Sequence, residues 1–129
     1  MKYIELFNLQ KSLEKIQKYP SIKSRYLLKR NQEVISNFMK IIVDVEKSIF
    51  TENVMNFEMK KSSMSSDEIK DYLSTHKEEF DVFVQNKKQF DDLLNQEAED
   101  CPPLLKITID DLPDDLTDEQ SQSIFHLVD

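Results

Sequence analysis

The chain contains no glycine, and its four prolines lie at positions 20, 102, 103 and 113. The 81 residues from Ser21 to Cys101 therefore lack both of the residue types that most often interrupt a helix. Glycine is also the residue that turns and phosphate-binding loops use where the backbone takes a positive φ angle. Its absence excludes P-loops, dinucleotide-binding turns and nucleophile elbows, and it argues against an all-β sandwich. The sequence predicts a mainly α-helical protein.

Two long helices are predicted in the segment without proline or glycine. Ser21 is a suitable cap for the first helix, and Ser65 with Glu68 forms a capping box that starts the second. In both helices a series of mostly apolar positions, completed by Asn31 in the first and by His76 and Lys87 in the second, alternates at spacings of three and four, as in a heptad repeat. The first series is Leu28, Asn31, Ile35, Phe38, Ile42, Val45 and Ile49, and the second is Ile69, Leu73, His76, Phe80, Phe83, Lys87, Phe90 and Leu94.

The shared period and the short serine-bearing connection favour a long antiparallel helical hairpin over residues 21–100. Phenylalanines of the second helix are expected to pack against aliphatic and aromatic side chains of the first. The expected contacts join Phe80, Phe83 and Phe90 to Ile35, Phe38, Ile42 and Val45. Burial of each such side chain stabilises the fold by about 1.5–3 kcal/mol.

Shorter elements are predicted at the two ends of the chain. Residues 1–20 are expected to hold a strand at Lys2–Phe7 and a short helix that is capped by Asn8 and ends at Tyr19. Residues 101–129 are expected to form an acidic strand, turn and helix, because apolar residues alternate at 105, 107 and 109 and a capping box follows at Thr117 and Gln120. The two strands would pair as a small two-stranded β element, and the whole chain, 1–129, would be a single domain.

Charge is distributed unevenly along the chain. Residues 1–61 carry a net charge of +5 and residues 62–129 carry −13, which together give −8. Two interpretations stay open: the basic stretch over 11–30 lies beside the acidic C-terminal stretch and neutralises it, or one of the two faces a partner. Direct binding of nucleic acid is not expected, because the basic stretch carries no recognised nucleic-acid-binding motif.

Residues that carry chemistry are few. One cysteine and two histidines cannot supply a closed zinc site, and Cys101 has no neighbouring base in the sequence. His76 falls within the apolar series of the second helix and is expected to be structural, whereas His126 is expected to be exposed. We predict no catalytic residue, no cofactor and no metal site, and therefore no enzyme. We also expect no membrane association, because no apolar stretch approaches the roughly 20 residues needed to span a bilayer.

The C-terminal stretch has a layout found in other proteins. It comprises Ile107, Thr108, Ile109, Asp110, Asp111, Leu112, Pro113, Asp114, Asp115, Leu116 and Thr117, followed by Ile124, Leu127 and Val128. This layout resembles a widespread group of small uncharacterised helical proteins encoded by tailed bacteriophages, in which a strand, a leucine–proline turn and a short acidic helix close the chain. Those proteins carry a glycine-bearing turn where this chain has Ser62–Ser66. The resemblance implies a phage origin, a location in the host cytoplasm or the virion, and no enzyme chemistry.

These observations together predict a protein that binds another protein. The partner would be a phage or host protein, in particle assembly or in modulation of the host, or a second copy of this chain. The candidate partner-binding residues are Ile22, Leu27 and Val34, which lie off the apolar series, and the acids Asp110, Asp111, Asp114 and Asp115. The alternative is an acidic inhibitor that mimics nucleic acid and blocks a host DNA- or RNA-binding protein.

Overall fold

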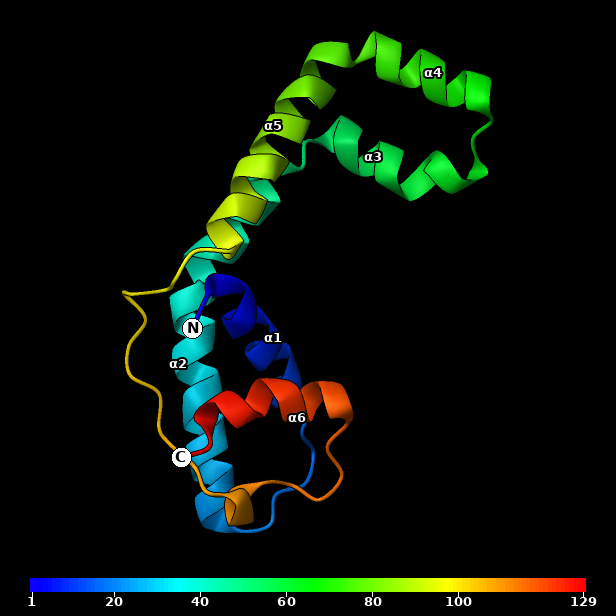
Figure 1. Cartoon of the computed structure of the whole chain (residues 1–129). Coiled ribbons are helices and arrows are strands. Elements are labelled where there is room, and N and C mark those ends of the chain that lie inside the picture. Colours follow the sequence, from blue (N-terminus) through cyan, green and yellow to red (C-terminus); the bar gives the residue numbers. More distant parts are fainter. The chain divides into compact units, whose positions relative to one another are not determined.

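A computed structural model describes all 129 residues, and its regular elements are helices (Figure 1). Six α-helices follow one another along the chain: α1 Tyr3–Glu14, α2 Ile22–Ile49, α3 Glu52–Lys60, α4 Ser66–Thr75, α5 Lys77–Leu94 and α6 Asp118–Ile124. Three short 3-10 turns are η1 Lys61–Ser63, η2 Ile109–Asp111 and η3 Phe125–Leu127. No helix combines the length and the apolar character needed to cross a membrane. The prediction of a mainly α-helical protein is confirmed.

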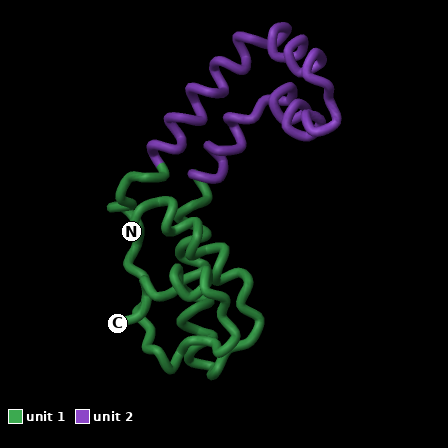
Figure 2. The backbone as a smooth tube through the Cα atoms, turned by 45° about the vertical axis from the view of Figure 1, so that its right-hand side comes forward, with its two compact units in different colours: residues 1–41, 94–129 green, residues 42–93 purple.

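The chain forms two compact units, which Figure 2 colours separately. The first unit contains Met1–Ile41 and Leu94–Asp129, and the second contains Ile42–Leu93. Helix α2 begins in the first unit and ends in the second. The organisation of residues 1–129 as a single domain stays a prediction.

The core of the first unit lies between α1 and α6, which are in contact. Leu6, Leu9 and Leu13 recur on α1 at spacings of three and four and are all buried. Ile124 and Leu127, at the end of the chain, are also buried. These five side chains belong to an apolar core that also contains Leu28, Ile35 and Met39 of α2 and Ile107.

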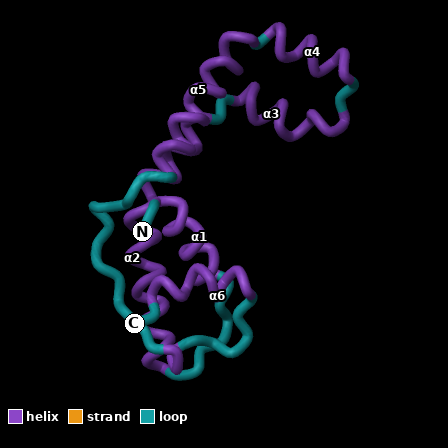
Figure 3. The backbone as a smooth tube through the Cα atoms, in the orientation of Figure 1, coloured by secondary structure: helices purple, strands orange, loops and turns teal.

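The prediction of a two-stranded β element is wrong, because the chain forms no strand (Figure 3). The segment Lys2–Phe7, which was expected to be a strand, lies mostly within α1. The Glu5 carboxylate accepts a hydrogen bond from the Lys2 backbone N–H at 2.8 Å, so α1 starts at Tyr3 and not at Asn8. The helical spacing of the buried leucines outweighs the short alternation at the start of the chain.

Each end of the chain instead makes one isolated β-bridge. Lys2 bridges Glu97, and Ile107 bridges Val128. The second bridge has two hydrogen bonds: the Ile107 N–H donates to the Leu127 carbonyl at 2.9 Å, and the Asp129 N–H donates to the Ile107 carbonyl at 3.0 Å. Ile107 therefore pairs with the C-terminal end of the chain and not, as expected, with the segment Lys2–Phe7.

Each of the two predicted long helices is divided in two. The first breaks after Ile49, where the Thr51 side chain accepts a hydrogen bond from the Val54 N–H at 3.4 Å and caps α3. The second breaks at His76, between α4 and α5. The Ser65–Glu68 capping box at the start of α4 is confirmed. Threonine is a good N-cap residue, so the sequence does contain a signal for the first break.

The second unit is held by contacts between aromatic side chains. The ring centroids of Phe50 and Phe83 lie 5.2 Å apart, and Phe57 lies 5.2 Å from Phe80 and 5.7 Å from Tyr72. Pairs at such distances are worth about 0.5–1.5 kcal/mol beyond their burial. Phe80 and Phe83 therefore contact the rings of Phe57 and Phe50, which were not among the partners expected.

Two of the expected hairpin residues have other positions. Phe38 stacks on Tyr3 within the first unit, with the ring centroids 6.0 Å apart. Phe90 of α5 is only 3% exposed and lies beside the end of α2, since it lines a cavity together with Val45 and Ile49. Phe90 thus lines this cavity together with Val45, one of its expected partners, whereas Phe38 contacts Tyr3 instead.

Candidate functional site

The loop that joins α1 to α2 borders the candidate site in the first unit. Helix α1 ends at Glu14, and residues 15–21 lead to α2. The Ser21 hydroxyl accepts a hydrogen bond from the Ser24 N–H at 3.0 Å, as expected for the cap of this helix. Pro20 stands just before this cap, where it cannot continue a helix. The first turns of α2 are thereby fixed next to the loop.

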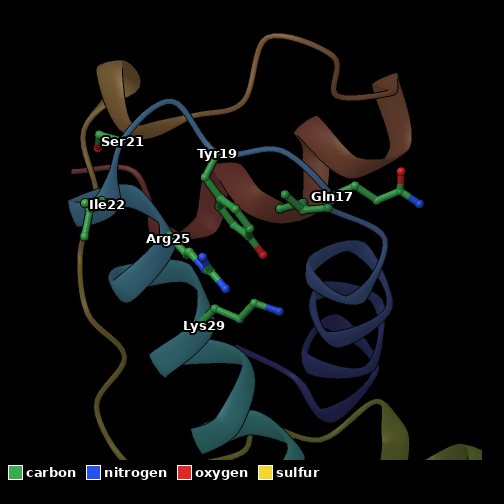
Figure 4. A pocket seen from close by; sticks show the side chains of 7 residues that line it. Gln17, Tyr19, Ser21, Ile22, Arg25 and Lys29 are labelled. Atoms are coloured by element: carbon green, nitrogen blue, oxygen red, sulfur yellow. The ribbon is translucent and has the colours of Figure 1, made fainter.

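A cavity of about 520 Å³ lies between this loop and α2. The loop contributes Gln17, Tyr19 and Ser21, with Ile16 at its start. Helix α2 contributes Ile22, Arg25 and Lys29. In Figure 4 the side chains of Tyr19, Arg25 and Lys29 point toward one another in the space between the loop and the helix. We call this space the basic cavity.

Positive charge in the basic cavity is not compensated. Arg25 and Lys29 are four residues apart and so lie on one face of α2, and neither is in an ion pair. No carboxylate lines the cavity. The Lys29 ammonium lies 5.9 Å from the centre of the Tyr19 ring, at the outer range of a cation–π contact. Two like charges at this spacing destabilise a helix by about 0.2–0.5 kcal/mol.

Two apolar side chains beside the cavity are exposed to solvent. Ile22 is 89% exposed and Tyr26 is 64% exposed, and the two are one helical turn apart. Their spacing from Arg25 and Lys29 puts all four residues on the same face of α2. We call Ile22, Arg25, Tyr26 and Lys29 the α2 patch. The sequence analysis found Ile22 but missed Tyr26 and the cavity.

The other two predicted apolar contact residues are less accessible. Leu27 and Val34 are both half-buried. They lie four residues before and three residues after Asn31, which is fully buried, so all three share one face of α2. The structure thus separates Leu27 and Val34 from Ile22, and it does not bring the three into one surface.

The four predicted acidic residues also fall into two groups. Asp110, Asp114 and Asp115 are exposed, whereas Asp111 is buried. The Asp111 carboxylate accepts hydrogen bonds from the Thr108 backbone N–H at 3.0 Å and from the Thr108 hydroxyl at 3.1 Å. The backbone bond, followed by the hydroxyl bond, holds the pKa of Asp111 below its ordinary value. Asp111 therefore acts as a structural group that closes the turn at η2.

The basic stretch and the acidic C-terminal stretch are not joined by ion pairs. None of the ion pairs connects a lysine or arginine of residues 11–30 to an acid of residues 110–129. The Lys23 charge contributes a minor part of the lowered pKa of Asp111. Of the basic stretch, only Arg30 is in an ion pair, with Glu33 on the same helix at 3.8 Å. Its other charges remain available to a partner.

The remaining candidates for chemistry have structural surroundings. The His76 Nδ1 atom lies 3.7 Å from Oε2 of Glu79. The Nε2 atom of the exposed His126 lies 3.3 Å from Oε2 of Glu5. Burial and the neighbouring Asp100 carboxylate raise the pKa of the Cys101 thiol, which disfavours the reactive thiolate. No group of three or more His, Cys, Asp or Glu side chains is placed to hold a metal ion.

No protein family, no curated protein and no solved structure matches this chain.

Proposed function

We propose that this protein is a non-enzymatic interaction protein that binds another protein through the α2 patch. The observation that carries the proposal is the exposure of Ile22 and Tyr26, at 89% and 64%, directly beside two cations without ion-pair partners. Isolated exposed apolar side chains are common on protein surfaces. An aliphatic residue, a tyrosine and an arginine on adjacent turns of one rigid helix are typical of the central residues of protein interfaces.

The proposed setting is a tailed bacteriophage and its host. The resemblance of residues 107–117 to small phage proteins supports this setting. The partner would be a phage protein in particle assembly or a host protein whose activity is modulated, and the protein would act in the host cytoplasm or in the virion. A long, regular helix suits this role, because it presents side chains at fixed spacing.

The alternative is an acidic protein that mimics nucleic acid through its C-terminal stretch. Asp110, Asp114 and Asp115 are available for such a role. Asp111 points inward and is already bound to Thr108, which removes one of the four carboxylates from the surface. We therefore favour the α2 patch as the binding surface.

Capture from cells tests the proposal. The wild-type protein and the double variant I22D/Y26D would each be immobilised and exposed to extracts of infected and uninfected host cells. We expect the wild-type protein to retain a partner that the double variant does not retain. The matched control is Ile41→Asp, because Ile41 is 73% exposed on the same helix but lies outside the patch.

Two results would count against the proposal. Equal retention of the partner by wild type and I22D/Y26D would show that the α2 patch does not bind the partner. Loss of the partner after neutralising Asp110, Asp114 and Asp115, with a steep loss of binding as salt rises, would favour the nucleic-acid mimic instead.

A further inference from the structure

The basic cavity brings together two positive charges that repel each other when no ligand is bound. Arg25 and Lys29 bring two like charges to one side of the cavity, with no carboxylate in its lining. Like charges four residues apart on one face of a helix repel each other. A bound anion would convert this repulsion into attraction to a shared counter-charge. The arrangement therefore points to an anionic ligand.

We propose that the basic cavity binds a phosphate monoester attached to an apolar body. A phosphate monoester carries a charge of about −1.5 to −2 near neutral pH, which matches the two cations. The Arg25 guanidinium can donate two parallel hydrogen bonds to phosphate oxygens, and the Lys29 ammonium acts as a compact positive charge beside it. The cavity shares Ile22, Arg25 and Lys29 with the α2 patch, and the binding of the phosphate monoester is tested below without a protein partner.

A hydroxyl group of the loop completes the polar side of the site. The Tyr19 phenol points toward the two cations, and it can donate one further hydrogen bond (Figure 4). The Ser21 hydroxyl also lines the cavity, but it lies apart from these three side chains, at the start of α2 (Figure 4). Tyr19 comes from the loop, so the ligand would contact the loop and α2 at the same time.

The size and walls of the cavity argue for more than inorganic phosphate. Its volume of about 520 Å³ falls within the roughly 300–1,000 Å³ of small-molecule sites. Ile16, which is 8% exposed, and Ile22 provide apolar surface, and the Tyr19 ring adds a flat face. An apolar body joined to the phosphate can occupy this space, whereas a bare phosphate would leave it to water.

A carboxylate is the competing anion, but its single negative charge matches the two cations of the cavity less well than a phosphate does. One carboxylate balances only one of the two cations. Its two oxygens can occupy the guanidinium fork, but they then offer fewer remaining acceptor sites to the ammonium and the Tyr19 hydroxyl than the three oxygens of a phosphate. We therefore expect a preference for phosphate over carboxylate of at least tenfold in affinity.

The test is a titration of the full chain labelled with ¹⁵N, followed by the backbone amide signals of Tyr19, Ser21, Ile22 and Arg25. The probes are phenyl phosphate, inorganic phosphate and phenylacetate. We expect saturable shifts of these signals with phenyl phosphate, and binding that is at least tenfold weaker for each of the other two probes. A capped alanine pentapeptide with a central phosphotyrosine identifies the source, since tighter binding than phenyl phosphate indicates a modified protein and equal or weaker binding indicates a small molecule.

Variants tie the shifts to the cavity. R25Q/K29Q should weaken the binding of phenyl phosphate at least tenfold, and Tyr19→Phe, which keeps the ring and removes only the hydroxyl, should weaken it several-fold. The matched control is Lys40→Gln, an exposed lysine of α2 outside the cavity, which should bind like wild type. The proposal is overturned if phenyl phosphate gives no saturable shifts, if R25Q/K29Q binds it as well as wild type, or if phenylacetate binds equally well.

Discussion

The side-chain amide of Asn31 pairs with the backbone of Leu105 through two hydrogen bonds. Its Nδ2 donates to the Leu105 carbonyl at 2.9 Å, and its Oδ1 accepts from the Leu105 N–H at 2.7 Å. Asn31 is fully buried on α2, and Leu105 belongs to the irregular segment that follows α5. Asn31 thus gives the Leu105 backbone the hydrogen-bond donor and the acceptor that a neighbouring strand would otherwise provide.

Replacement of Asn31 by leucine should destabilise the first unit. The variant removes both hydrogen bonds and leaves the Leu105 amide and carbonyl groups without their partner, which costs about 1–3 kcal/mol. Urea unfolding followed by circular dichroism measures the change. The control is Asn37→Leu, an exposed position on the same helix, where we expect a change within about 0.5 kcal/mol. Equal stability of the Asn31 variant and wild type would show that the pairing contributes nothing to the fold.

Gln120 joins α6 to α1. Its Nε2 donates to the Ser12 carbonyl at 3.2 Å, and its Oε1 accepts from the Thr117 N–H at 3.0 Å. Gln120→Glu keeps an acceptor for Thr117 but places an oxygen against the Ser12 carbonyl. We expect a loss of about 1–3 kcal/mol in the free energy of unfolding at neutral pH. Gln122→Glu, at an exposed position of α6, should change it little, and a similar loss in both variants would contradict this role of Gln120.

Asp111 should make the stability of the first unit depend on pH. Hydrogen bonds from Thr108 lower its pKa in the folded state below the value of about 3.9 for an unperturbed aspartate. Its stabilising contribution is therefore present above that ordinary pKa and is lost as the pH falls through the lower, folded value. Asp111→Asn should flatten the fall in stability between pH 5 and pH 2, measured as the urea midpoint.

The control for this pH dependence is the neighbouring Asp110→Asn. Asp110 is exposed, and its carboxylate makes no hydrogen bond to Thr108. We expect the Asp110 variant to keep the acid-induced loss of wild type. An unchanged pH profile in the Asp111 variant would show that other carboxylates determine the acid response.

Phe90 should be the most sensitive aromatic position of the second half of the chain. It is 3% exposed, in contrast to Val84 on the same helix, which is 62% exposed. Phe90→Ala leaves a cavity and should cost about 3–5 kcal/mol, measured by thermal or urea unfolding. Val84→Ala should stay within about 0.5 kcal/mol. Comparable losses in the two variants would mean that α5 does not bury Phe90 in solution.

Local capping chemistry could be predicted from the sequence. Ser21, the Ser65–Glu68 box and the Thr117–Gln120 box all start helices where expected, because each cap depends on residues only three positions apart. The start of α1 could not be predicted in the same way. There a glutamate alone caps the helix through the backbone of Lys2, which has none of the usual capping side chains.

Contacts between distant segments account for the remaining differences. Asn31 fits the apolar series of α2 and is buried as expected, but its partner is Leu105 and not a facing helix. The spacing of Arg25 and Lys29 is visible in the sequence as part of the basic stretch. The position of Tyr19 above them depends on the path of the loop over residues 15–21, which no local pattern specifies. For this reason the basic cavity emerged only from the structure.

The central claim is that the α2 patch binds a protein partner. The most direct measurement is the affinity of the purified, identified partner for wild type, I22D/Y26D and Ile41→Asp by titration calorimetry. We predict that the double variant binds the partner at least roughly 30-fold more weakly, equivalent to about 2 kcal/mol, while Ile41→Asp binds like wild type. Equal affinities for wild type and I22D/Y26D would contradict the account.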